Sequence, residues 1–217
     1  MNLCHSVDDI DGSKPTIFVD FHVTLSLKNY WDHLQLPTYR VIDIALFRHS
    51  PTIVDEWMHG KISAEEVTAY VAGKTGLDRQ ELLDSLITGC IDTTYLAGLA
   101  LAVSALRNHA QTVLFTDNTD CLHRFVLPGS HLSSAFDHIA SSWVMQARKL
   151  QILEELAQRW PRAPFLFVDD SQEVISRCGE LGYTGIQTAS PGETLRILQY
   201  LPDQPLFGEV DRLILSA

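Results

Sequence analysis

Three apolar runs along the chain, each followed at once by polar side chains, predict the buried strands of a parallel sheet. The runs are residues 17–19, 112–115 and 165–168. None of them alternates polar with apolar positions, and this is typical of strands that are buried on both faces. The polar residues that follow are Asp20, then Thr116, Asp117 and Asn118, and then Asp169 and Asp170. Because parallel strands end at the same edge of a sheet, we expect these side chains to lie together.

Between the first and second of these strands, the spacing of apolar residues becomes helical. Ser63 and Glu66 form a capping box, in which each side chain accepts a backbone N–H of the other residue. Asp78 and Glu81 repeat this signal before a second helix. Residues 26–96 are therefore expected to be an insertion of several helices.

The second half of the chain alternates helices with strands. The clearest helix is predicted for residues 149–160, where apolar residues recur at spacings of three and four. Further strands are predicted at residues 136–140 and 185–187, and Ser190 followed by proline marks the start of another helix. The predicted fold class is α/β, with a parallel sheet that carries helices on both faces.

The composition is that of an ordinary globular protein, since 46% of the 217 residues are hydrophobic and 20% are charged. The net charge of −11 argues against a nucleic acid or an anionic membrane as partner. Residues 1–14 are predicted to be a loose polar lead-in rather than a signal peptide, and no apolar run is long enough to span a bilayer. With no disulfide or zinc spacing among the cysteines, a cytoplasmic protein is expected. The oligomeric state stays open.

The carboxylates expected at one edge of the sheet predict a metal site. Without a cation they would repel one another, and one would stay protonated. A divalent cation with oxygen ligands removes this problem, and Mg²⁺ suits a site of few carboxylates plus waters. A small anionic ligand also fits such a site, because a metal ion or a lysine reverses the local field.

The first apolar strand and the residues after it resemble a motif of the haloacid-dehalogenase-like (HAD) superfamily, in which the strand leads into Asp-x-Asp-x-Thr/Val. The corresponding segment is Asp20-Phe21-His22-Val23-Thr24, so a histidine replaces the second aspartate. Three other pieces are similar to the family in the expected order, namely Gly60-Lys61-Ile62-Ser63, residues 97–107, and residues 167–171 with Leu181-Gly182. Two of these pieces resemble the subgroup in which a helical cap follows the first strand.

The resemblance implies a division into domains and a set of residue roles. A Rossmann-like core would comprise residues 1–25 and 97–217, and a helical cap would comprise residues 26–96. Asp20 would be the nucleophile that forms an aspartyl-phosphate. The metal would be bound by Asp20, the carbonyl of His22 and Asp170, and Asp169 would orient a metal-bound water. Thr116 would bind the phosphoryl group, and Asn118 would contact the substrate. Lys149 would compensate negative charge.

Three departures from the family pattern leave alternatives open. The replaced aspartate protonates the leaving oxygen in the family, and His22 either takes over this work or only packs. The second motif places either Thr116 or Asp117 at the phosphoryl group, and the strand boundary favours Thr116. At the position four residues after Asp170 the chain has Val174, with Glu173 beside it as a substitute whose side chain leaves the helix in another direction.

The leading hypothesis is a magnesium-dependent hydrolase of a small phosphorylated metabolite. A second hypothesis is chemistry of the dehalogenase or phosphonate-cleaving type, which needs no second aspartate; the latter uses a lysine of the cap, for which Lys61 and Lys74 are the candidates. A third is a binding or scaffold protein on an impaired hydrolase frame. Tyr30, Trp31 and Trp57 either face the substrate or pack between cap helices, and their helical spacing favours packing.

Overall fold

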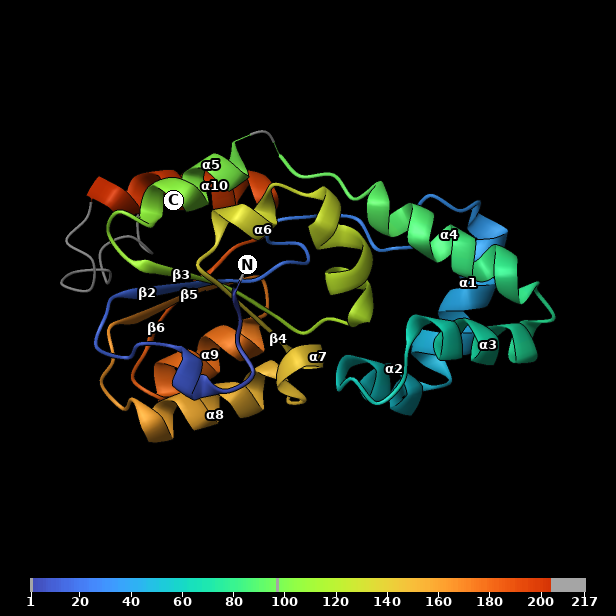
Figure 1. Cartoon of the computed structure of the whole chain (residues 1–217), viewed down its shortest axis with the longest axis horizontal. Helices are drawn as coiled ribbons and strands as arrows, with labels where there is room; N and C mark the ends of the chain where they lie inside the picture. The colour runs from blue at the N-terminus through green and yellow to red at the C-terminus, as the bar shows by residue number, and fades with distance from the viewer. Residues whose placement is uncertain (1, 97, 204–217) are drawn as a thin grey trace.

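The computed structural model describes residues 2–96 and 98–203 and contains a six-stranded, fully parallel sheet between two layers of helices (Figure 1). The order of the strands in the sheet is β1-β4-β3-β2-β5-β6. The strands are β1 (Asn2–Leu3), β2 (Thr16–Val19), β3 (Gln111–Thr116), β4 (His138–Ser141), β5 (Phe165–Asp169) and β6 (Thr184–Gln187). The predicted Rossmann-like α/β class is confirmed.

The central strand β2 explains why the apolar run after Pro15 is continuous. All four of its residues are buried. Ile17 and Val19 belong to the core on one face of the sheet, and Phe18 belongs to the core on the other face. Since side chains of a strand alternate between its faces, a strand covered on both sides has apolar residues at successive positions, and the hydroxyl of the buried Thr16 at its start donates to the carbonyl of Lys14.

Helices cover both faces of the sheet and extend beyond one end of it. Figure 1 shows α5, α6 and α10 on one face and α8 and α9 on the other. These helices, with the short α7, are α5 (Leu99–Leu106), α6 (Leu132–Ala135), α7 (Ser142–Met145), α8 (Lys149–Arg159), α9 (Gln172–Glu180) and α10 (Pro191–Tyr200). Single turns of 3-10 or π type are η1 (Val7–Asp9), η2 (Ile44–Arg48), η3 (Leu122–Val126), η4 (Leu127–Gly129) and η5 (Leu201–Asp203).

The segment between β2 and α5 forms a separate group of helices at one end of the molecule (Figure 1). Its helices are α1 (Leu36–Asp43), α2 (Pro51–Met58), α3 (Ala64–Thr75) and α4 (Arg79–Ile91). The predicted capping box is present, because Ser63 accepts from the N–H of Glu66 and Glu66 accepts from the N–H of Ser63. Asp78 caps α4 in a similar way, by accepting from the N–H of Glu81.

One prediction about the N-terminal region is wrong. Residues 1–14 were expected to be a loose lead-in, but β1 pairs with β4 in the sheet and the N–H of Cys4 donates to Ile139. Ser6 and Asp9 then cap the short turn η1. A strand of two residues has no period that a sequence pattern can reveal.

The remaining boundaries differ by small shifts from those predicted. The strand expected at residues 136–140 is observed at His138–Ser141, and β5 includes Asp169 at its end. Ala97, where the predicted core domain resumes, and residues 204–217 lie outside the described part of the chain.

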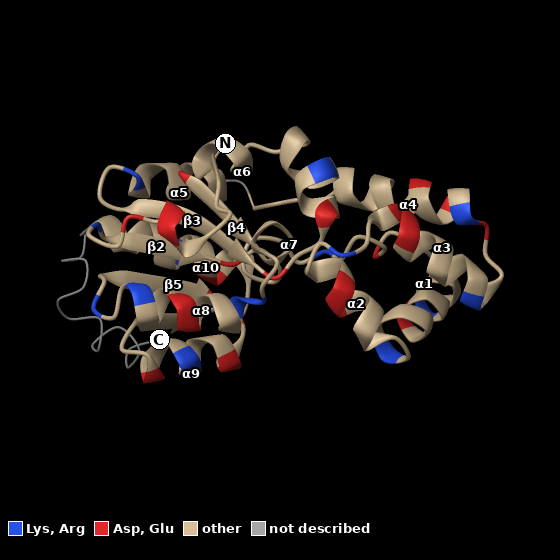
Figure 2. Ribbon diagram, turned by 60° about the horizontal axis from the view of Figure 1, so that its bottom comes forward, with Lys and Arg blue, Asp and Glu red and all other residues tan. Residues whose placement is uncertain are grey.

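Among the described residues, no helix combines the length and the apolar character needed to cross a membrane. Figure 2 shows basic positions interspersed with acidic ones along the helices of both regions.

Candidate active site

Asp20 directly follows β2, between the ends of β3 and β5. Its backbone N–H donates to the carbonyl of Val168 at 2.9 Å, so the neighbouring strand fixes the main chain at this point. The Asp20 residue is only 4% exposed. A carboxylate that is buried to this extent needs a charged partner or hydrogen-bond donors to stay ionised.

Lys149 is that partner, and it comes from the first position of α8. Its Nζ lies 3.0 Å from Asp20 Oδ1 and 2.7 Å from Asp169 Oδ2, and the residue is 7% exposed. Burial lowers the pKa of Lys149, but the two carboxylates outweigh this effect and raise the pKa above its ordinary value. The ammonium group is therefore charged and stabilises both carboxylates.

Three carboxylates, those of Asp20, Asp169 and Asp170, converge at this edge of the sheet. One oxygen of each lies within 4.8 Å of the others. Burial, followed by the charge of Asp20, raises the pKa of Asp169 to about 6 and also raises the pKa of Asp170. One lysine offsets one of three negative charges, and oxygen donors at this spacing suit Mg²⁺. The residues present therefore fit the predicted metal.

A cavity of about 400 Å³ opens over this cluster, and we call it the carboxylate cavity. Its lining residues are Asp20, His22, Asp117, Arg148, Lys149, Leu150, Asp170, Ser171, Glu173 and Val174. Both Val174 and Glu173 are thus at the cavity, although the helix was expected to direct Glu173 elsewhere. Val174 is 4% exposed and also belongs to the apolar core.

The two residues considered for the second motif have different positions. Thr116 ends β3, is 1% exposed, and does not belong to the lining of the carboxylate cavity among the described residues. Asp117 lines it, and its carboxylate accepts from Arg148 Nε and from the N–H of Lys149, both at 2.8 Å. The geometry favours Asp117 over Thr116 at this position, contrary to the sequence-based preference. Arg148 offsets the negative charge that Asp117 brings to the cavity.

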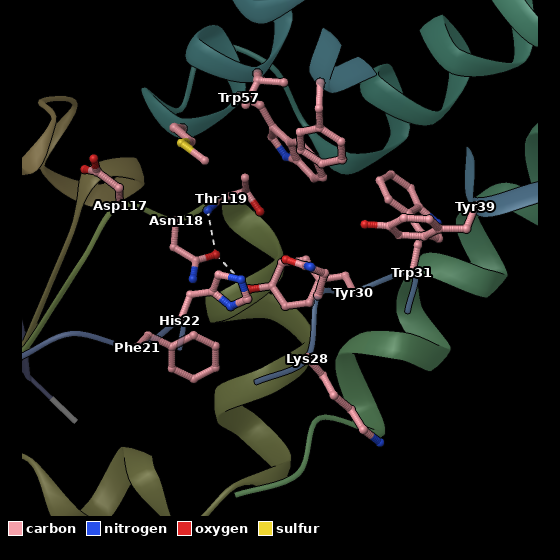
Figure 3. A pocket seen from close by; sticks show the side chains of 14 residues that line it. Phe21, His22, Lys28, Tyr30, Trp31, Tyr39, Trp57, Asp117, Asn118 and Thr119 are labelled. Carbon is pink, nitrogen blue, oxygen red and sulfur yellow. Dashed lines mark hydrogen bonds between the residues drawn. The ribbon is translucent and has the colours of Figure 1, made fainter. Parts of the chain in front are cut away.

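A second cavity, of about 130 Å³, adjoins the first, and we call it the aromatic cavity (Figure 3). Six of its lining residues are aromatic, namely Phe21, Tyr30, Trp31, Tyr39, Phe47 and Trp57. Trp31 and Trp57 are 3% and 2% exposed and belong to the core. The interpretation that these tryptophans pack between helices is confirmed, and contact with a substrate stays a prediction, although both side chains also line a cavity.

Asn118 lies at the aromatic cavity rather than at the carboxylate cluster. Its Oδ1 accepts from the hydroxyl of Tyr30 at 2.7 Å and from the N–H of Thr119 at 2.9 Å. Its own N–H donates to Ser142 Oγ at 2.9 Å. These bonds fix the loop after β3 and hold Tyr30 in place, so the structure gives Asn118 a positioning role.

His22 lines both cavities and therefore lies at their junction. Figure 3 shows its ring beside Tyr30 and Asn118. No hydrogen bond joins the ring to another described side chain, so the ring nitrogens are available to a ligand in either cavity. The next residue, Val23, has a φ of 61°, which is an unusual backbone conformation for a β-branched residue.

A buried carboxylate that sequence reasoning did not single out connects the aromatic cavity to the sheet. Asp120 is 1% exposed and accepts from Trp57 Nε1 at 2.6 Å, from the N–H of Ala64 at 3.1 Å and from Arg124 at 2.7 Å. Arg124 also pairs with Glu65 of α3. The position of Trp57 is thus fixed from the loop after β3. The only sequence signal was an aspartate near a strand end.

Comparisons with known proteins give matches at the level of structure. No protein-family model matches the chain, and no curated protein matches it. A HAD family enzyme from Bacteroides thetaiotaomicron has a TM-score of 0.61 and 13% identity, over 80% of this chain and 94% of that one. A predicted HAD-like family hydrolase from Porphyromonas gingivalis has a TM-score of 0.63 and 18% identity, over 94% and 100%. An L-2-haloacid dehalogenase from Xanthobacter autotrophicus has a TM-score of 0.56 and 13% identity, over 89% and 84%. The chain has the HAD-like fold.

The HAD-like fold agrees with the Rossmann-like α/β class that the sequence predicted, and the division into a core and a cap stays a prediction. Within it, Asp20, Lys149, Asp169 and Asp170 lie together, as expected of a site at the carboxyl ends of parallel strands. Because one fold serves many functions, the argument for an activity depends on the site itself.

Proposed function

We propose that the protein is a magnesium-dependent hydrolase that acts on a small anionic, phosphorylated metabolite with Asp20 as nucleophile. The observation that carries this proposal is the contact of Lys149 Nζ with Asp20 and Asp169 beside three converging carboxylates. A nucleophilic carboxylate must stay ionised in a buried place, and the adjacent ammonium group stabilises that form.

The proposed reaction has two steps. A carboxylate oxygen of Asp20 attacks phosphorus, the bond from phosphorus to the leaving oxygen breaks, and an aspartyl-phosphate remains. Water then attacks the phosphorus of this intermediate and releases inorganic phosphate. Lys149 provides positive charge near the phosphoryl oxygens, while Arg148 offsets the charge of Asp117. Mg²⁺, held by Asp20, Asp170 and the carbonyl of His22, would supply further stabilisation of the developing negative charge.

His22 is the residue that we assign to proton transfer. The leaving oxygen needs a proton as its bond to phosphorus breaks, and a positioned acid is worth about 10²- to 10⁴-fold in rate. The ring lies at the junction of the two cavities, where the leaving group would enter. Imidazole is suited to this work because one ring nitrogen can donate a proton while the other accepts one.

The comparisons support a site for magnesium and an anion in proteins of this fold. The enzyme from Bacteroides thetaiotaomicron was crystallised in complex with magnesium and inorganic phosphate. In the same proposal, residues 1–25 and 97–217 form the core domain and residues 26–96 form a cap that shapes the entrance to the site.

The test is phosphate release from a panel of phosphorylated metabolites, with Mg²⁺ and with a chelator. Release is expected only with the metal, and Asp20→Asn is expected to reduce it by about 10³-fold or more. Asp8→Asn is the matched control, since the Asp8 side chain is 64% exposed and pairs with Arg159 far from the cluster. The proposal fails if the panel gives no release and Asp20→Asn leaves Mg²⁺ binding unchanged.

A second candidate is hydrolysis at carbon, and the position of Asp117 favours it. Arg148 pairs with Asp117, but the carboxylate oxygens at the cavity still repel the oxygens of an anionic phosphoryl group more than a neutral carbon centre. Asp20 would attack carbon and displace a halide, which needs no proton, and water would then cleave the ester. The dehalogenase from Xanthobacter autotrophicus was crystallised with chloropropionic acid covalently bound. Halide release that is unaffected by a chelator would favour this candidate.

The phosphonate-cleaving alternative receives less support from the cap lysines. Lys74 lies over the ring of Tyr70 and lines a different cavity, and Lys61 is exposed.

A further inference from the structure

We infer that the substrate carries a compact, neutral, apolar group of about the size of a benzene ring next to its reacting atom, and that the aromatic cavity binds this group. The inference rests on the proposed function, because it takes Asp20 as the place of reaction. It specifies the substrate class further than the carboxylate cluster does, since that cluster recognises only charge.

The size of the cavity sets the size of the group. Its volume is about 130 Å³. A dry, apolar cavity of about 150 Å³ in another protein holds one benzene molecule. Around the cavity the aromatic walls are joined by Val54 and Met58. Filling a cavity with such walls is more favourable with an apolar group than with water, because the group removes apolar surface from water.

The two cavities are neighbours, because His22 and Asp117 line both of them. A single ligand can therefore place its reacting atom at Asp20 and its apolar group among the aromatic rings. The two parts of such a ligand would lie on either side of the same two residues, so the connection between them is short. This spacing favours a group attached directly or through one or two atoms.

The charges near the cavity favour a neutral group over a cation. Aromatic walls also bind quaternary ammonium groups, because the faces of the rings attract a cation, and an unpaired carboxylate nearby would strengthen this attraction. Asp117 is already paired with Arg148, and Asp120 is paired with Arg124. Lys28 also lines the cavity and adds positive charge at its rim. An uncharged occupant avoids this repulsion.

The walls are held in place before any ligand arrives. Trp57 donates to the buried carboxylate of Asp120 at 2.6 Å, and Tyr30 donates to Asn118 at 2.7 Å. Side chains that are already ordered lose little entropy when a ligand binds, so the contact area is converted efficiently into affinity. A cavity with such walls distinguishes ligands by shape.

The test compares benzylphosphonate with methylphosphonate by calorimetry on the full chain with Mg²⁺. Both carry the same anionic group and neither has a phosphoester bond to hydrolyse. We expect benzylphosphonate to bind about 50-fold more tightly, which corresponds to ~2.3 kcal/mol at about 1.4 kcal/mol per tenfold. Benzyl alcohol and tetramethylammonium are titrated as probes of the cavity alone, and benzyl alcohol is expected to bind more tightly.

Two variants locate the effect. Phe47→Ala removes one wall of the cavity. It should reduce the preference for benzylphosphonate over methylphosphonate about 5- to 10-fold and leave the affinity for methylphosphonate unchanged. Ile44→Ala is its matched control, because Ile44 lies on the same helical turn, is 42% exposed against 45% for Phe47, and lines a different cavity. Val54→Phe fills the cavity and should abolish the preference.

The outcomes separate the inference from the proposed function. If methylphosphonate binds but benzylphosphonate binds no more tightly, or if tetramethylammonium binds better than benzyl alcohol, the inference is overturned and the proposed function stands. If benzyl alcohol binds and methylphosphonate does not, the proposed function fails, and the substrate class inferred from it fails with it. If Ile44→Ala has the effect of Phe47→Ala, the aromatic cavity is not the binding place.

Discussion

The carboxylate cavity and the aromatic cavity share His22 and Asp117, but they are built from different parts of the chain. The charged groups of the first come from the ends of neighbouring parallel strands and from the first turn of α8. Most rings of the second come from the segment between β2 and α2, and they pack as a core does. The first cavity needs its charges balanced before it is stable, whereas the second is stabilised by the burial of its own walls.

The largest effect is expected from removing the positive charge that balances the carboxylates of the first cavity. Lys149→Met replaces the ammonium group with an apolar side chain of similar length and leaves the buried carboxylates of Asp20 and Asp169 without a cation. We expect the free energy of unfolding at neutral pH to fall by about 3–5 kcal/mol in the absence of metal. Mg²⁺ should restore part of this loss, because it neutralises the same carboxylates. Urea denaturation with and without Mg²⁺ measures both effects.

Lys14→Met is the control for this prediction. The Lys14 side chain is 64% exposed and pairs with Asp11 at the surface, so its removal should change the free energy of unfolding by less than about 0.5 kcal/mol. If the two variants lose the same stability, the buried cluster does not depend on its lysine.

The next prediction disturbs the aromatic cavity through the residue that supports it. Asp120→Ala leaves Trp57 Nε1 and the charge of Arg124 without their buried acceptor. Because unsatisfied buried donors are costly, we expect the free energy of unfolding to fall by about 3 kcal/mol. Asp120→Asn keeps one acceptor oxygen and should lower the free energy of unfolding by about half as much. Urea denaturation followed by tryptophan fluorescence measures both, and equal losses would show that the oxygen retained in Asp120→Asn does not replace the carboxylate as an acceptor.

The sequence predicted the carboxylate cavity better than the aromatic one, and the reason lies in how each is encoded. Asp20, Asp169 and Asp170 each follow an apolar run, so a rule about strand ends was sufficient to bring them together. Lys149 was placed by resemblance alone, because the first residue of a helix can point toward solvent as easily as toward a sheet. Thr116 and Asp117 were hard to separate, since a shift of one residue turns a strand's side chains to the other face.

The aromatic cavity had no comparable signal. Trp31 and Trp57 have the spacing of core residues, and a cavity wall and a core position look alike in a sequence. Trp31 and Trp57 meet residues 117–119 because of how the helices between β2 and α5 pack on the loop after β3, and local sequence patterns do not specify this packing. The short strand β1 was missed for a similar reason, because its partner rather than its own two residues defines it.

A smaller effect is expected from pH and concerns the turn η3, which follows the loop that supports the aromatic cavity. Burial lowers the pKa of His123 from 6.5 to about 4, while Asp120 acts weakly in the opposite direction. Between these values the unfolded chain binds a proton that the folded chain does not, so stability rises with pH. The contribution of His123 is complete above pH 6.5 and is lost as the pH falls toward 4.

We expect this loss to be roughly 2 kcal/mol, after allowing for the partial exposure of the ring. His123→Gln should remove that part of the pH dependence in urea denaturation curves between pH 7 and 4. His109→Gln, at an exposed position, should leave the curve unchanged. A pH dependence that is the same in all three proteins would contradict the assignment.

The smallest predicted effect lies at the junction of the two cavities, in the backbone beside His22. Val23 has a φ of 61°, and a left-handed conformation costs an L-residue about 1–2 kcal/mol. Val23→Gly removes this cost but increases the entropy of the unfolded chain, whereas Val23→Ala keeps the cost and loses two methyl groups. The glycine variant should therefore exceed the alanine variant by about 1 kcal/mol in the free energy of unfolding. Equal stabilities would mean that the loop changes conformation on substitution. A higher stability with glycine would indicate that the wild-type chain maintains strain next to His22, which lines both cavities, as active sites often do.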